Sequence, residues 1–141
     1  MIVELMDDIP LDVVWTPWSQ SELAGAPIPP QEIVRLSNQV WGMRDGSGNL
    51  LLLAGVFKPS LIGTMAELWL LIAEDFNMYR HAREVRNLFK CAQEIYPVLQ
   101  VKVKEQFLTG LKFAKHFGFR EVGDMTVDNQ RFVVLECHLE H

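Results

Sequence analysis

The segment Val98–Gly123, which reads VLQVKVKEQFLTGLKFAKHFGFREVG, carries the clearest structural signal in the chain. Its opening, Val98 to Val103, is short and largely apolar, which predicts a buried strand. Apolar residues then recur at helical spacing from about Gln106 to Phe117, and Gly118 is the kind of residue that stops a helix. The chain then turns through Phe119–Gly123 into another strand. The segment therefore predicts a strand, a helix and a strand in succession.

Four more strands are predicted upstream of this segment. Met1 to Met6 alternates weakly and suits an opening strand, and a turn at Asp45–Gly48 is a hairpin signal because glycine reaches positive φ without a Cβ clash. The runs rich in strand-forming residues are Ile33–Arg44, Asn49–Lys58 and Met65–Ala73. Between them, Asp7 or Asp8 is a candidate cap for a short helix with Pro10 in its first turn, and residues 15–30, with Trp15 and Trp18, predict a loop.

A long helix is predicted over roughly Tyr79 to Tyr96, because apolar residues recur there at three- and four-residue steps. Asn77 is the expected N-cap, and Pro97 ends the helix. At the end of the chain, residues 121–127 and 131–138 form a closing hairpin around Asp128-Asn129. The order of elements predicts an α/β fold: a mixed central sheet of about six to seven strands with helices on both faces.

Length and composition narrow the class of protein. The chain of 141 residues is expected to form one domain over residues 1–138, and Leu139-Glu140-His141 resembles the start of a histidine tag. The net charge of −5 argues against non-specific binding to nucleic acid or to an anionic membrane, and no apolar run reaches the roughly 18 residues of a membrane span. Cys91 and Cys137 are predicted to be buried free thiols, which together with the lack of a secretory signal suggests a cytoplasmic protein.

The stretch LKFAKHFGFREVG, which ends at Gly123, resembles the end of the GNAT acyltransferase fold, where the family carries a sequence like ALRFYEKLGFREVG. The predicted order of elements also matches that family over nearly the whole chain. The resemblance implies transfer of an acyl group from acyl-CoA, with acetyl-CoA as cosubstrate, to the amine of a small molecule or a peptide.

The resemblance also implies where acetyl-CoA would bind. The strand before the long helix would offer backbone groups to the pantetheine arm at Leu71, Ile72 and Ala73. The pyrophosphate would sit at the start of the helix, where free N–H groups and the helix dipole favour an anion. The family writes this turn as Q/R-x-x-G-x-G/A, whereas residues 77–82 read NMYRHA, without glycine. The resemblance places the cofactor beside Tyr79, Arg80, His81, Ala82 and Arg83. Arg80, His81 and Arg83 could supply positive charge to the pyrophosphate, or they could form a basic, solvated first turn. Ala82 stands for the last small residue of the motif, and Tyr79 could stack on the adenine or fasten the start of the helix.

For catalysis, the resemblance points to Glu67, on the strand where some family members carry a general base that acts through water. Glu67 should share a strand face with Trp69 and Leu71, and an apolar face would favour its protonated form; a position at the solvent end of the strand is the alternative. Two positions depart from the family pattern. Ala114 stands where many members have a tyrosine that protonates the leaving thiolate, and Phe107 stands where an asparagine often opens the last helix.

A second hypothesis follows from these departures. The chain also resembles short GNAT-like proteins of tailed phages, including an internal virion protein of podophages, which implies a non-catalytic binding protein of the host cytoplasm or virion. A pocket filled by Trp69 or Tyr79 would favour that hypothesis, and an open gap between the strands at Ala66 and Val98 would favour the enzyme. Edge strands near the closing hairpin are candidates for pairing in a homodimer.

Overall fold

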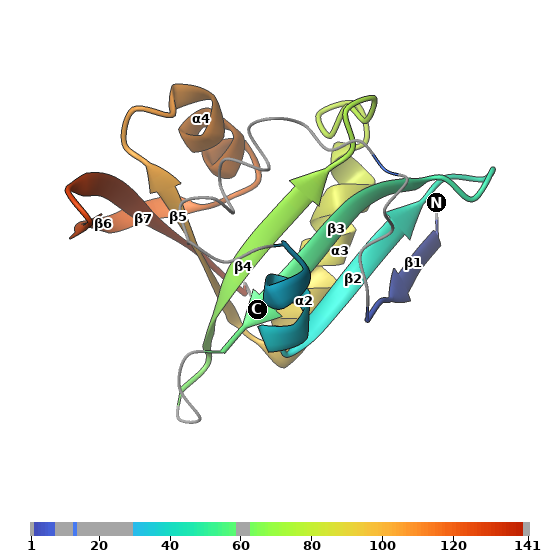
Figure 1. Cartoon of the computed structure of the whole chain (residues 1–141), viewed down its shortest axis with the longest axis horizontal. Helices are drawn as coiled ribbons and strands as arrows, with labels where there is room; N and C mark the ends of the chain where they lie inside the picture. Colours follow the sequence, from blue (N-terminus) through green and yellow to red (C-terminus); the bar gives the residue numbers. More distant parts are fainter. Residues whose placement is uncertain (1, 8–12, 14–29, 59–62, 140–141) are drawn as a thin grey trace.

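The computed structural model describes residues 2–7, 13, 30–58 and 63–139, which form one twisted sheet with helices packed against it (Figure 1). The elements follow one another in the predicted order. They are β1 (Ile2–Leu5), α2 (Pro30–Leu36), β2 (Gln39–Arg44), β3 (Leu50–Phe57), β4 (Met65–Ile72), α3 (Ala82–Ile95), β5 (Val98–Lys104), α4 (Leu108–His116), β6 (Arg120–Val127) and β7 (Gln130–His138).

The sheet contains seven strands in the order β1-β2-β3-β4-β5-β7-β6. β4 and β5 run parallel, and the other neighbouring strands pair antiparallel. α3 covers one face of the sheet and α2 lies on the other (Figure 1). These observations confirm the mixed α/β sheet with helices on both faces.

Two apolar clusters divide the core between the faces of the sheet. The larger cluster joins the buried side of α3, including Val85 and Leu88, to Leu52 and Leu99. The smaller joins Val34 of α2 to strand residues such as Leu53 and Leu71, with Trp69 packed against it. Residues from both faces of β3 and β4 enter these clusters, as expected for strands that read as continuous apolar runs.

Both predicted hairpin turns are present. In the first, Gly48 has φ +85°, and the Asp45 carboxylate accepts hydrogen bonds from the backbone N–H groups of Ser47 and Asn49 at 2.9 and 3.0 Å. These bonds, chiefly those from Asn49, lower the pKa of Asp45 from its ordinary value of 3.8. In the second turn Asp128 and Asn129 both have positive φ, which is the geometry of a two-residue hairpin.

Several sequence predictions are wrong. The first part of the run from Ile33 is the helix α2 rather than a strand; Pro30 suits the first turn of a helix and Glu32 pairs with Arg35 one turn later. The long helix begins at Ala82, later than predicted, because residues 78–81 form a turn instead. Cys91 is exposed and Cys137 is half-buried, so neither is buried as predicted, although both are free thiols.

Some predictions fall outside the part of the chain that the structure describes. These concern the short helix expected after Asp7 or Asp8 and the loop with Trp15 and Trp18. Among the described residues, no helix combines the length and apolar character that a membrane crossing requires.

A close contact between β3 and β4 gives a direct test of the packing. Gly55 lies opposite Trp69, and a Cβ atom at Gly55 would stand 2.1 Å from the indole ring. The indole also donates a hydrogen bond to the Ser37 hydroxyl at 2.7 Å, so it has little freedom to move. Gly55→Ala should therefore lower the free energy of unfolding by about 1–3 kcal/mol. The matched control is Gly46→Ala, where nothing lies within 4 Å of the added Cβ. Equal urea midpoints for the two variants would contradict the packing.

Candidate functional site

β4 and β5 separate inside the sheet. They are in register only at Met65–Val98, Ala66–Leu99 and Glu67–Gln100. Beyond that point β4 remains paired with β3 as far as Ile72, and β5 remains paired with β7 along its whole length. The strands are therefore still paired at Ala66 and Val98, where the acyltransferase hypothesis placed a gap, and they part only after Glu67.

Along β4, the backbone N–H and C=O groups of successive residues point alternately toward β3 and toward the gap. Thr64 accepts a hydrogen bond from Val98 of β5, whereas the N–H of Ala73 donates to Leu51 on the β3 side. Because backbone direction alternates along a strand, Leu68 and Leu70 direct their N–H and C=O groups toward the gap. Past the last register pair, β5 no longer lies opposite these groups.

This alternation changes the prediction for the pantetheine arm. Of the three residues expected to offer backbone groups, Leu71 and Ala73 turn theirs toward β3, and only Ile72 has the same orientation as Leu70. The side chains of all three are buried in the core. Sequence reasoning did not select Leu70. Which residues of β4 turn their backbone groups toward the gap depends on the register of β4 with β3, and this register is not visible in the sequence.

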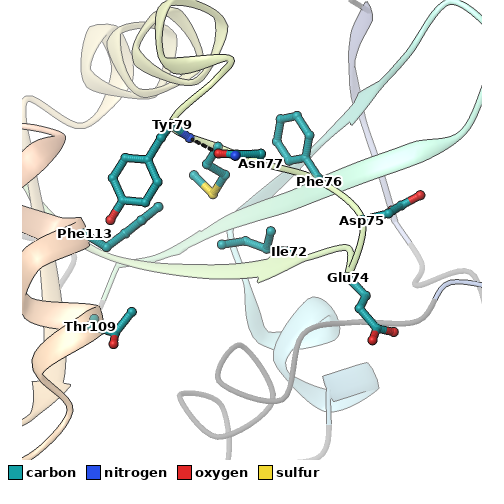
Figure 2. A pocket seen from close by; sticks show the side chains of 10 residues that line it. Ile72, Glu74, Asp75, Phe76, Asn77, Tyr79, Thr109 and Phe113 are labelled. Atoms are coloured by element: carbon teal, nitrogen blue, oxygen red, sulfur yellow. Dashed lines mark hydrogen bonds between the residues drawn. The ribbon is translucent and has the colours of Figure 1, made fainter.

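A cleft of about 320 Å³ adjoins the end of β4. Its walls are Ile72 of β4, the turn that follows, and α4, which contributes Thr109, Gly110 and Phe113. In Figure 2 the rings of Tyr79 and Phe113 lie close together on one side of Ile72, and the carboxylates of Glu74 and Asp75 point away from these rings. The volume falls in the range of small-molecule sites, and the wall beside β4 is mostly apolar.

The turn before α3 is closed on itself by Asn77. The Asn77 Oδ1 atom accepts hydrogen bonds from the backbone N–H groups of Tyr79 and Arg80, at 3.0 and 3.2 Å. Asn77 therefore caps this turn rather than the helix. Two of the N–H groups expected to meet a pyrophosphate are bound by the protein's own carboxamide.

The start of α3 itself remains open. His81 precedes the helix without making a side-chain cap, and the first intrahelical hydrogen bond runs from Val85 to His81. The N–H groups of Ala82, Arg83 and Glu84 consequently have no acceptor within the helix. The His81 ring stacks on Phe76 at 5.4 Å between centroids, while the side chains of Arg80 and Arg83 are exposed. Neither arginine plugs the helix start.

Tyr79 fastens the turn to α4. Its ring contacts Phe113 edge-on at 5.8 Å, His116 at 4.8 Å and Phe117 at 6.2 Å between centroids. This observation favours the fastening role over stacking on adenine. Tyr79 lines the cleft without filling it, and Trp69 lies on the opposite face of the sheet with Ser37.

Glu67 shares its face with Trp69 and Leu71, as predicted, but its surroundings are not apolar. Its carboxylate forms an ion pair with the Lys102 ammonium of β5. The two side chains are about one third exposed, at 32% and 36% respectively. The sequence alone did not reveal this contact, because Lys102 lies 35 residues further along the chain than Glu67.

α4 approaches β5 closely at Gly110, where a Cβ atom would stand 2.6 Å from the Phe107 ring and 3.1 Å from Val103. Phe107 precedes the helix without a side-chain cap. Ala114, at the position of the family's tyrosine, is buried in the larger core cluster. Across the described ranges, no group of three or more His, Cys, Asp or Glu side chains is arranged to hold a metal ion.

Comparisons with solved structures identify the fold. A GNAT family acetyltransferase from Elizabethkingia anophelis with acetyl-CoA bound aligns with a TM-score of 0.69 at 13% identity, over 98% of this chain and 97% of that one. An IAA acetyltransferase from Bacillus cereus gives a TM-score of 0.64 at 14% identity, over 98% and 99%. The chain therefore has the GNAT N-acetyltransferase fold.

A spermidine/spermine N-acetyltransferase from Vibrio cholerae is also similar, with a TM-score of 0.59 at 17% identity over 71% of this chain. The match covers 64% of that enzyme, so this chain spans less than two thirds of its length. No protein-family model matches the sequence, and no curated protein matches it significantly.

The self-capped turn can be tested by mutation. Asn77→Ala removes the acceptor for two backbone N–H groups, and loss of such a cap typically costs about 1 kcal/mol. We expect the free energy of unfolding, measured by urea titration, to fall by that amount, which lowers the urea midpoint. Asn87→Ala, at an exposed position within α3, is the matched control and should leave the midpoint unchanged or raise it slightly. A similar loss in both variants would rule out the cap.

Proposed function

We propose that the protein transfers an acyl group from acyl-CoA to a primary amine of a small molecule or peptide. Acetyl-CoA is the donor with which to test this. The observation that carries this proposal is the separation of β4 and β5 after Glu67, beside a cleft lined by Ile72 at the end of β4 and by the turn before α3. A parted pair of parallel strands exposes backbone donors and acceptors within the sheet, which suits an extended arm rich in amide groups.

The donor would lie along the gap, with its amides on the backbone of Leu68 and Leu70. Its phosphates would lie at the N-terminus of α3, near the open N–H groups of Ala82 and Arg83. The exposed Arg80 and Arg83 side chains would add positive charge there, partly replacing the backbone donors that Asn77 occupies. His81, which stacks on Phe76, contributes to the shape of the turn.

The chemistry would use groups on both sides of the gap. The N–H of Leu70 points into the gap and is placed to stabilise the oxyanion that develops on the thioester carbonyl. Glu67 would take the proton from the attacking amine, directly or through water. Because Ala114 has no proton to donate, water would protonate the leaving thiolate.

Binding of the donor is the first test. Acetyl-CoA at 100 times its Kd should raise the free energy of unfolding by about 2.7 kcal/mol, measured by denaturant titration with and without ligand. Arg83→Gln should weaken binding by about tenfold at low salt, since a charge-assisted hydrogen bond contributes roughly 1.5–3 kcal/mol and each 1.4 kcal/mol is tenfold in Kd. Arg35→Gln, on α2 across the sheet, is the control and should bind normally. No stabilisation at millimolar acetyl-CoA would count against the proposal.

Catalysis is the second test. With spermidine and other primary amines as acceptors, Glu67→Gln should lower kcat/KM by about 10²- to 10⁴-fold, because a positioned base is lost. Acetyl-CoA affinity should not change. Glu105→Gln removes a carboxylate that is likewise ion-paired, with Arg131, and should keep full activity. Equal rates for wild type and Glu67→Gln would remove Glu67 from the mechanism.

A binding protein without catalysis is the second candidate, and the Asn77 contacts favour it. A turn whose N–H groups are satisfied internally needs no phosphate to be stable. Under this alternative the chain would be a virion-associated or other binding protein that retains the fold alone. It predicts neither stabilisation by acetyl-CoA nor acetylation of any amine.

A further inference from the structure

We propose that Lys102 is itself an acyl acceptor, so that the protein acylates its own Lys102 side chain. This inference rests on the proposed function, because it needs a thioester bound in the gap between β4 and β5. It is motivated by the contact between the Lys102 ammonium and Glu67, the carboxylate assigned as the base. An amine in hydrogen-bonding contact with the base occupies the place that an external acceptor would take.

The position of Lys102 in the sheet supports this assignment. Gln100 is the last residue of β5 in register with β4, and Lys102 is the next residue on the same strand face. Lys102 therefore stands on the opposite side of the gap from Leu68 and Leu70. Its side chain is 36% exposed and can be reached by a ligand.

Glu67 is the carboxylate that contacts the Lys102 amine, and the other carboxylate on this face, Glu136, has different partners. On the same face, the two Glu136 oxygens are engaged separately, one by Gln100 at 3.1 Å and the other by His138 at 3.0 Å. An ion pair between partly exposed side chains contributes little to folding. The pair between Lys102 and Glu67 is therefore not needed to hold the sheet together.

The reaction balances without any further reagent. The Lys102 ammonium passes one proton to Glu67, and the neutral amine attacks the thioester carbonyl. A C–N bond forms as the C–S bond breaks. The second proton lost by the nitrogen neutralises the leaving thiolate, and Glu67 releases the first to solvent. The products are an amide on Lys102, free CoA thiol and one proton, and the ammonium beside Glu67 has been removed.

The experiment uses the whole protein incubated with acetyl-CoA at neutral pH, followed by intact mass measurement and peptide mapping. We expect a single acetyl group, on Lys102, at a rate that does not depend on protein concentration. Lys102→Arg should abolish this modification, and Glu67→Gln should slow it at least about tenfold. Lys104→Arg is the matched control, because Lys104 lies two residues along the same strand and forms no ion pair with a described residue. That variant should be acetylated normally at Lys102.

Parallel measurements separate this inference from the proposed function. A urea-unfolded sample gives the rate of uncatalysed acetylation, and equal labelling of Lys102 in the folded and unfolded protein would overturn the inference. Acetylation of an external amine with Lys102 unmodified would also overturn it while leaving the proposed function intact. If acetyl-CoA fails to stabilise the protein and no amine is acetylated, both proposals fail together.

Discussion

The separation of two parallel strands within a continuous sheet is the constraint on which the site depends. β4 is held by β3 through six register pairs, and β5 is held by β7 along all seven of its residues. Only three register pairs join β4 to β5. Each strand therefore follows its outer neighbour, and the twist of the two halves carries them apart. Backbone groups that leave a ladder in the interior of a protein need other partners, so the gap is a place where an extended ligand gains hydrogen bonds.

α4 forms one wall of the cleft beside the end of β4. The helix approaches β5 at Gly110 and presents Phe113 to the cleft, and the ring of Tyr79 joins it to the turn before α3. Arg86 strengthens this junction, since it donates a hydrogen bond to the His116 carbonyl at 3.2 Å and lies over the Phe117 ring. The aromatic contacts of Tyr79 hold the turn before α3 against α4, and this turn and α4 form two walls of the cleft.

Most of the fold could be predicted from the sequence, because the signals were local. Gly118 adopts positive φ after α4, the Asp128-Asn129 turn closes the last hairpin, and the apolar runs of β3 and β4 lie at the centre of the sheet. α2 was missed because its β-branched residues resemble a strand, while the helix is short and buries only part of its surface, including Val34. Local pattern cannot separate those two outcomes.

The site was less predictable, because its features depend on contacts between distant segments. The backbone groups of Leu70 point toward the gap because of the register of β4 with β3. The ion-pair partner of Glu67 lies 35 residues away on β5. The replacement of a glycine turn by Asn77 is different, since its residues are adjacent in sequence and the departure from the family motif was visible. What the sequence could not give was the direction of the Asn77 carboxamide.

Under the proposed function, that carboxamide would weaken the binding of the phosphates without preventing it. A hydrogen bond between neutral groups contributes about 0.5–1.5 kcal/mol, and one to a charged group about 1.5–3 kcal/mol. A phosphate oxygen can therefore displace Asn77 from the N–H groups of Tyr79 and Arg80 with a net gain, and the first turn of α3 offers further N–H groups from Ala82 onward. When no ligand is bound, the hydrogen bonds from the Tyr79 and Arg80 N–H groups to Asn77 stabilise the turn. A glycine turn binds its anion more tightly but costs more conformational entropy to order, so Asn77 exchanges affinity for stability at the place where the phosphates would bind.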